Sequence, residues 1–343
     1  MANLRTNKLV GIGSTDAGLT FDGDIKFNTP NVMYFPTGDT TQRGRGRMLV
    51  GGGFAPGIVN TIDYITIQSL GNAVEFGDLS VARGYVAAVG SDTRGVFGGG
   101  YVAPTGNNTM DYVTISTTAN AADFGDQNVT AWGRTGCGNQ TRGIWAGGSP
   151  GLDDMEYITI ATTGNGTDFG NLSSGRREPA GLASPTRGVL AGGYVQPSVA
   201  SNRSNVIDYV TIATTGNATD FGDMTGRYAC PSGCSSTTRG LIWGGQTPTA
   251  TATIDYIEIA TTGDAADFGD MTVAAYRGSA SSNSIRGVNA LGASPSASNV
   301  INYVTIATTG DASDFGDLTY ATHLSGATSD LSLIHISEPT RPY

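Results

Sequence analysis

Residues 208–223 read Asp-Tyr-Val-Thr-Ile-Ala-Thr-Thr-Gly-Asn-Ala-Thr-Asp-Phe-Gly-Asp, and close copies of this stretch occur six times in the chain. The copies begin at Asp63, Asp111, Glu156, Asp208, Asp255 and Asn302. Subtracting successive starting positions gives spacings of 48, 45, 52, 47 and 47 residues. Spacings of this size are typical of one supersecondary unit repeated as a propeller blade or a solenoid coil. The chain is therefore an array of repeats.

Each repeat has one part of fixed length and one part of variable length. An arginine follows the starting position after 31 residues in five repeats, as 94 − 63 shows for the first. From that arginine to the next starting position the distance varies from 14 to 21 residues. Packing and strand register hold a segment at fixed length, whereas a surface loop is free to lengthen. The arginines are Arg47, Arg94, Arg142, Arg187, Arg239 and Arg286.

The residue pattern within a repeat alternates with period two, which predicts β-strands. In the second repeat we expect strands at 94–100, 111–116 and 121–126, and the first strand of the next unit near 134–139. Helical periodicity is absent, so the prediction is an all-β fold of four-stranded units. We expect six blades closed into a ring by a strand within 318–330 that pairs with residues 47–53, because closure removes two open sheet edges. A longer natural chain would leave room for a seventh blade.

An arginine near a turn, an apolar strand ending in Gly-Gly, a variable loop, a tyrosine and an aromatic residue further on together resemble the kelch repeat. The glycine pairs begin at Gly51, Gly99, Gly147, Gly192 and Gly244. This resemblance covers about residues 47–330 and implies a β-propeller, but it says almost nothing about function. The repeated aromatic residues are Tyr64, Tyr112, Tyr157, Tyr209, Tyr256 and Tyr303, with Phe76, Phe124, Phe169, Phe221, Phe268 and Phe315 where kelch repeats usually carry tryptophan.

The composition excludes some classes of partner. The chain has 343 residues, 51 glycines and 14% charged residues, which is typical of a β protein rich in turns. A net charge of −10 argues against nucleic acid, because no basic surface would neutralise phosphates. No stretch has the length and apolarity of a membrane span. We interpret the basic run Arg43, Arg45 and Arg47 as turn residues and not as a phosphate site.

Both ends of the chain leave the repeat pattern. Residues 1–46 lack the apolar region of a secretory signal and predict a small β appendage or linker. Within it, residues 36–43 resemble a short element of phage tail-fibre and related virion proteins, and a plain polar linker is the alternative. The repeated segment spans 47–330. Residues 331–343 break the phase and resemble a translated sequencing adapter, so we expect a truncated gene with a non-native tail.

Catalytic and metal-binding chemistry has few candidate residues. The histidines are His323 and His335, and the second lies in the suspected tail, so neither a histidine metal cluster nor a Ser-His-Asp triad can be assembled. We expect Cys137, Cys230 and Cys234 to be small core thiols. The chain is therefore predicted to be a non-enzyme without a cofactor or a metal.

The carboxylates follow the repeat period. An acid precedes the repeated phenylalanine in all six units, whereas a catalytic pair is needed only once. We interpret these acids as turn caps or as partners of the repeated arginines. Calcium is the alternative, but the spacing lacks the oxygen density of a calcium loop. The acids are Glu75, Asp123, Asp168, Asp220, Asp267 and Asp314.

The variable segments are the predicted recognition face. In a four-stranded blade the second-to-third-strand loop and the connection to the next blade emerge on the same face, so these segments gather together. Aromatic rings mixed with arginine, asparagine and glutamine suit stacking on sugars, although isolated exposed aromatic residues are also ordinary surface. The predicted ligand contacts are Tyr101, Trp132, Arg134, Tyr194, Tyr276 and Arg277.

Two classes of function compete. The first is a virion component of tail-fibre type that attaches to a host surface glycan or protein and assembles with other virion proteins. The second is a cellular kelch-type interaction module, either cytoplasmic or part of a longer surface protein lost with the truncation. A carbohydrate-active enzyme is a third, disfavoured class because the histidines are missing and the acids are periodic. We expect no nucleic-acid or membrane partner, and the sequence leaves the oligomeric state open.

Overall fold

The computed structural model describes residues 46–195, 202–293 and 295–330. The predicted appendage before Gly46 and the predicted tail after Asp330 lie outside these residues. The described residues form strands, turns and loops and contain no helix, which confirms the all-β prediction. Within the same residues, accordingly, no helix is present that could span a membrane.

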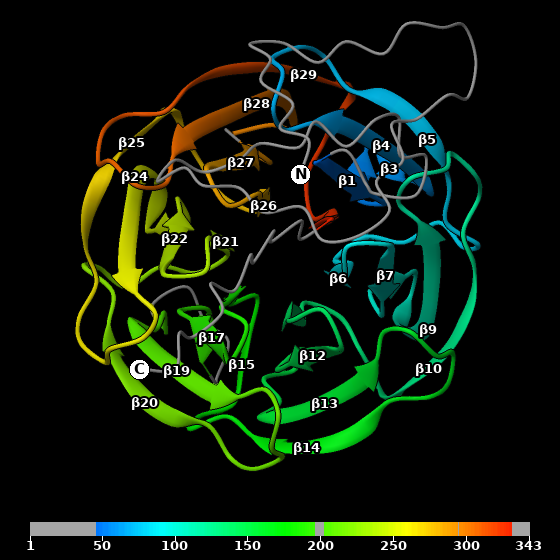
Figure 1. Cartoon of the computed structure of the whole chain (residues 1–343), viewed down its shortest axis with the longest axis horizontal. Helices are drawn as coiled ribbons and strands as arrows, with labels where there is room; N and C mark the ends of the chain where they lie inside the picture. Colours follow the sequence, from blue (N-terminus) through cyan, green and yellow to red (C-terminus); the bar gives the residue numbers. More distant parts are fainter. Residues whose placement is uncertain (1–45, 196–201, 294, 331–343) are drawn as a thin grey trace, which may run out of the picture. The chain divides into compact units, whose positions relative to one another are not determined.

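The described strands form six antiparallel blades around a common axis (Figure 1). In each blade we name the strands a to d, from the axis to the circumference. Blade 1 contains β30 (Gly326–Ser329), β1 (Arg47–Gly51), β4 (Thr61–Thr66) and β5 (Val74–Asp78). Blade 2 contains β6 (Ala87–Gly90), β7 (Arg94–Gly98), β9 (Thr105–Thr114) and β10 (Ala122–Ala131). Blade 3 contains β11 (Thr135–Gly138), β12 (Arg142–Ala146), β13 (Asp154–Thr159) and β14 (Thr167–Asn171).

The other three blades follow the same order. Blade 4 contains β16 (Ala180–Ala183), β17 (Arg187–Ala191), β19 (Val206–Thr211) and β20 (Thr219–Asp223). Blade 5 contains β21 (Ser232–Ser235), β22 (Arg239–Trp243), β24 (Thr249–Glu258) and β25 (Ala266–Ala275). Blade 6 contains β26 (Ser279–Ser282), β27 (Arg286–Ala290), β28 (Ser298–Thr305) and β29 (Ser313–Thr322). Short strands lie in the b–c loops and beside them: β2 (Phe54–Ala55), β3 (Gly57–Ile58), β8 (Tyr101–Val102), β15 (Arg176–Arg177), β18 (Tyr194–Val195) and β23 (Gln246–Thr247).

The ring closes as the sequence predicts. Strand β30 pairs with β1 in antiparallel register, with Met48 opposite Ser329 and Gly51 opposite Gly326. Only the end of the predicted segment 318–330 forms this strand, because residues up to Thr322 continue strand d of blade 6. The Asp330 carboxylate accepts a hydrogen bond of 2.8 Å from the Gly46 amide, so the closing turn joins two distant parts of the chain.

Some of the predicted b–c loops are more regular than expected. In blades 2 and 5 the loop folds back as a hairpin, with β8 pairing with β9 and β23 pairing with β24. Strand d lengthens with strand c in these blades, and Ala131 reaches Asn107. The variable loops therefore present short, hydrogen-bonded ribbons on this face of the propeller.

The hydrophobic core lies between neighbouring blades. Phe221 of β20 packs with Ile257 and Ile259 of the next blade, in one of six clusters that each join two blades. All six repeated phenylalanines are buried, at 1–3% exposure, which confirms their predicted position between strand d and the next blade. Each phenylalanine contacts the tyrosine of its own blade edge to face, with ring centroids 5.9–6.0 Å apart.

The repeated arginines complete this framework. Each guanidinium lies 4.1–5.0 Å from the centroid of the tyrosine ring in its own blade. Each also donates to a backbone carbonyl of the next blade, as Arg47 does to Ile115 at 2.9 Å. The hypothesis that these arginines pair with the acids before phenylalanine is therefore wrong, and those acids are exposed. We call this repeated unit the Arg–Tyr–Phe framework.

Candidate functional site

An axial cavity opens on the face that carries the b–c loops. Its volume is ≈ 130 Å³, and residues at the start of strand a in all six blades line it. We call it the mouth cavity. At its rim lies one residue per blade, always 22 positions after the acid or asparagine that starts the repeat, as 85 − 63 shows. These mouth residues are Tyr85, Gly133, Glu178, Cys230, Arg277 and Leu324.

All six mouth residues have a left-handed backbone, with φ between 54° and 69°. The conformation lets the backbone run from blade to blade around the rim: the Glu178 amide donates to Gly133, the Cys230 amide to Glu178, and the Arg277 amide to Cys230. Only glycine adopts this conformation without cost, and other residues pay about 1–2 kcal/mol. Five positions nevertheless carry side chains. Strain of this kind gathers at functional sites, which marks the rim as a candidate.

A polar cluster lies at the rim around the Glu178 carboxylate. The Cys230 thiol donates to Glu178 Oε2 over 2.8 Å. Arg277 Nε lies 3.5 Å from the same oxygen, and Arg177 Nη1 lies 3.3 Å from Oε1. Glu178 itself is buried. The cluster thus joins one carboxylate, one thiol and two guanidinium groups at the entrance of a cavity.

Burial and charge act on the titrating groups of this cluster. Burial raises the pKa of Cys230 well above its usual value, and the neighbouring Glu178 carboxylate raises it further, so the thiol keeps its proton. Burial would lower the pKa of Arg277, but Glu178 and Cys230 outweigh it and raise the pKa. Burial raises the pKa of Tyr85, and it raises the pKa of Tyr194 to about 12. These groups therefore keep their protons near neutral pH.

Aromatic rings surround the cluster in what we call the aromatic belt. Tyr85 lies 4.6 Å from Trp132 and 5.9 Å from Phe54, measured between ring centroids. The Arg177 guanidinium is held between Trp132 and Tyr194, 4.9 Å from each ring centroid. The belt therefore presents aromatic ring faces, with an arginine side chain held between two of them. Its members are Phe54, Tyr85, Tyr101, Trp132, Tyr194 and Tyr276, with His323 stacked on Phe54.

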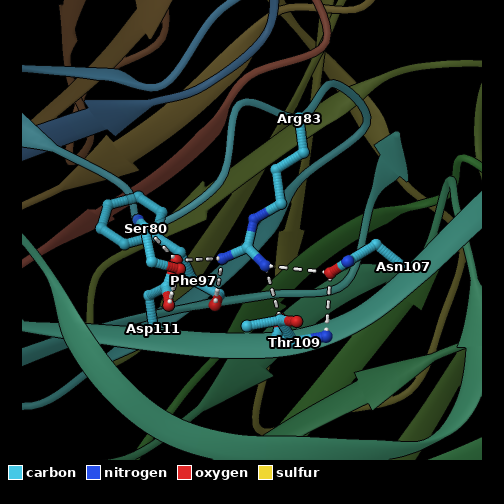
Figure 2. Close-up of polar contacts among 6 residues, drawn as sticks. All are labelled: Ser80, Arg83, Phe97, Asn107, Thr109 and Asp111. Atoms are coloured by element: carbon cyan, nitrogen blue, oxygen red, sulfur yellow. Dashed lines mark hydrogen bonds and ion pairs between the residues drawn. The ribbon is translucent and has the colours of Figure 1, made fainter. Parts of the chain in front are cut away.

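Buried arginines hold the b–c loops in place through hydrogen bonds to strand c. Figure 2 shows Arg83 reaching Asp111 of β9, with Nη2 donating to the carboxylate over 2.8 Å. The same side chain donates to the Thr109 carbonyl over 2.6 Å and to the Asn107 side chain over 3.2 Å. Burial lowers the pKa of Arg83, whereas Asp111 raises it. Arg176 makes the equivalent pair with Asp208.

The structure brings five of the six predicted ligand residues to this rim. Tyr101, Trp132, Tyr194 and Tyr276 belong to the aromatic belt, and Arg277 is a mouth residue. Of these, Tyr194 is largely buried, and its hydroxyl donates to Gln246 over 2.8 Å. It therefore supports Arg177 more than it faces solvent.

Arg134 differs from the prediction. Its side chain is 1% exposed and makes ion pairs of 2.8 Å with both Glu156 and Asp154. It forms the buried ion pair of blade 3, as Arg83 does in blade 2 and Arg176 in blade 4, although it lies three positions later in the repeat. Arg134 lines the mouth cavity, but its guanidinium is buried in these ion pairs, so we assign it a structural role and not a ligand contact.

A scan against protein-family models and a search of the curated proteins both find no match for this chain.

Sequence reasoning missed Glu178 and the role of Cys230. Cys230 is buried, as predicted for a core thiol, but its thiol lies at the mouth and bonds to Glu178. By contrast, Cys137 and Cys234 are ordinary buried thiols, and burial raises the pKa of each to about 12. Comparing the residue at each equivalent position of the six repeats would have found the mouth, because its spacing is constant while its residue type changes.

The opposite end of the axis differs in chemistry. A second cavity of ≈ 230 Å³ lies on the a–b turn face, and most of its lining residues are glycine, alanine, serine and threonine. Serine hydroxyls there join neighbouring a strands, as Ser282 does by donating to the Ser235 carbonyl over 2.7 Å. Among the described residues, no group of three or more His, Cys, Asp or Glu side chains is placed to hold a metal ion.

Proposed function

We propose that this chain is a non-enzymatic binding module that recognises a surface glycan through the aromatic belt and the mouth cavity. The observation that carries the proposal is the concentration of aromatic rings and arginines around one end of the axis. Sugars stack on such rings through their C–H faces, and each aromatic contact contributes about 0.5–1.5 kcal/mol beyond area burial. Affinity for one copy is therefore modest, and several copies on one particle would give avidity.

The finer proposal is a virion component of tail-fibre type that attaches to a host cell surface, bound to other virion proteins. It is supported by the resemblance of residues 36–43 to tail-fibre elements and by the changing residues on a constant scaffold. The alternative is a cellular kelch-type interaction module, supported by the Gly-Gly and tyrosine pattern. The genes beside this one on the same DNA would distinguish the two settings.

The test uses the fluorescently labelled full chain, as a monomer and as an artificial multimer, on glycan arrays and candidate host cells. We expect the multimer to bind selected glycans and Trp132→Ala to lose most of that binding. The matched control is Ile285→Ala, since Ile285 is 62% exposed on the a–b turn face. Equal binding by the Trp132 variant would place the site elsewhere, and turnover of any glycan would overturn the non-enzymatic proposal.

A further inference from the structure

One oxygen in the mouth cavity lacks a hydrogen-bond donor. The Glu178 side chain is 5% exposed, and its Oε2 is engaged by the Cys230 thiol. Its Oε1 is buried and has no hydrogen-bond partner among the described residues; the Arg177 contact at 3.3 Å is electrostatic and lacks hydrogen-bond geometry. Leaving a buried carboxylate oxygen without a donor is costly. A ligand that brings a donor to this oxygen would remove that cost.

The charges around Glu178 limit the ligand class. Arg177 and Arg277 each carry a positive charge, so with Glu178 the local sum is +1, and an ammonium ligand would meet net repulsion. The same sum would attract an anionic ligand, but an ionised carboxylate only accepts hydrogen bonds and so brings no donor to Glu178 Oε1. A hydroxyl is neutral and can donate and accept at once. It can donate to Glu178 Oε1, while Arg277, whose buried Nε also lacks a hydrogen-bond partner, can donate to a neighbouring oxygen.

The size of the cavity limits the ligand further. Drug-sized ligands occupy pockets of about 300–1,000 Å³, and the mouth cavity is ≈ 130 Å³. It therefore admits part of a single sugar ring, and the rest of a longer glycan would lie over the aromatic belt. Tyr85 belongs to both the cavity wall and the belt, so it links the two.

Building on the proposed glycan binding, we propose that the mouth cavity receives a neutral terminal sugar residue through adjacent hydroxyl groups. One hydroxyl donates to Glu178 Oε1, and a second oxygen accepts from Arg277. Cys230 is a positioning residue, because its thiol donates to Oε2 and leaves Oε1 as the carboxylate oxygen without a donor. Because burial and Glu178 raise the thiol pKa, Cys230 remains a donor at neutral pH.

The experiment titrates the full chain with methyl glycosides of glucose, galactose and mannose, and with methyl glucuronide as the anionic probe. Saturation-transfer NMR detects binding and calorimetry measures affinity. We expect at least one neutral glycoside to bind and Glu178→Gln to weaken it about 10- to 100-fold, the range for one hydrogen bond to a charged group. Ile285→Ala is the control and should bind like the unmodified chain.

A second pair of variants tests the positioning role of Cys230. Cys230→Ala removes the donor to Oε2 and should weaken the same glycoside, whereas Cys230→Ser keeps a donor and should restore its affinity. Equal loss in both would contradict the positioning role. Thermal melts of each variant show whether it is folded, and the pair tests the site even if Glu178→Gln does not fold.

The remaining outcomes separate this inference from the proposed function. If no neutral glycoside binds, or only the glucuronide binds, the neutral-sugar inference is overturned. If Trp132→Ala abolishes binding on the glycan array while Glu178→Gln does not change it, the aromatic belt is the glycan site and the inference about the mouth cavity fails alone. If neither variant changes array binding, both proposals fail.

Discussion

The Arg–Tyr–Phe framework and the mouth residues are both present once in every blade, but they vary in opposite ways. In the framework the side chains are the same in all six blades, and the Tyr–Phe ring centroids lie 5.9–6.0 Å apart each time. At the mouth the backbone is constant, with φ of 54–69°, while the side chain is different in every blade. Repetition is needed where blades pack together. At the mouth the fold requires only a backbone conformation that glycine provides, so the side chains there are free to serve binding.

The largest expected effect is in the framework. Phe221 is 3% exposed and packs against the next blade, so Phe221→Ala should lower the free energy of unfolding by about 3–5 kcal/mol. Chemical denaturation of the full chain supplies the measurement. Val273→Ala is the control, because Val273 is 48% exposed on the neighbouring blade and should change stability little. A loss near zero for Phe221→Ala would show that the framework does not depend on this inter-blade packing.

The next effect is a pH dependence at the ring closure. Burial raises the pKa of Asp330 from 3.8 to about 7, although hydrogen bonds from Gly46 and Arg47 oppose the rise. Between these two pKa values the folded chain holds a proton that the unfolded chain releases. The contribution of this proton to the free energy of unfolding is therefore complete below pH 4 and is lost as pH rises towards 7 and above. Each pKa unit is worth about 1.4 kcal/mol, which sets an upper bound of about 4 kcal/mol.

The variant Asp330→Asn isolates this contribution. It keeps an acceptor for the Gly46 amide but cannot titrate, and asparagine already caps the equivalent turns at Asn139 and Asn283. Denaturant midpoints measured from pH 4 to pH 8 should fall less steeply for the variant than for the unmodified chain. Identical slopes would show that other buried acids, such as Asp63, cause the pH dependence.

A smaller effect distinguishes two kinds of blade. Asp208 is paired with buried Arg176, whereas Asp255 is held by Thr225, whose hydroxyl donates over 2.7 Å. Asp208→Asn would leave the arginine without its counter-charge and should cost about 3 kcal/mol, the low end for breaking a buried pair. Asp255→Asn should be nearly neutral, because blade 6 already uses Asn302 in this way. Equal losses in denaturation experiments would refute the distinction.

The sequence predicted most of the framework because six copies of the repeat meet the same physical requirement, although it assigned the wrong partners to the repeated arginines. The buried phenylalanines, the strand order and the closure by residues near 330 all follow from that periodicity. The sequence analysis also failed where a residue acts once. Arg134 lies three positions out of phase with Arg83 and Arg176, yet its long side chain reaches the same buried position. Loop length and motifs did not point to Glu178, because its loop neither lengthens nor repeats a motif. Its importance comes from its φ and from its contacts with other blades.

The smallest expected change in stability concerns the mouth itself. Tyr85 has φ of 55°, so Tyr85→Gly should remove about 1–2 kcal/mol of backbone strain. The same change removes the ring contacts with Phe54 and Trp132. We expect a net change within about 1 kcal/mol, together with a clear loss of glycan binding. The matched control is Tyr209→Gly. Tyr209 is a half-buried framework tyrosine on β19 without a left-handed backbone, so glycine there weakens the strand and relieves no backbone strain. Denaturant midpoints and array binding measured on both variants decide the matter: equal destabilisation would mean that Tyr85 is retained for packing, whereas lost binding with preserved stability would mean that the strain is kept for the ligand.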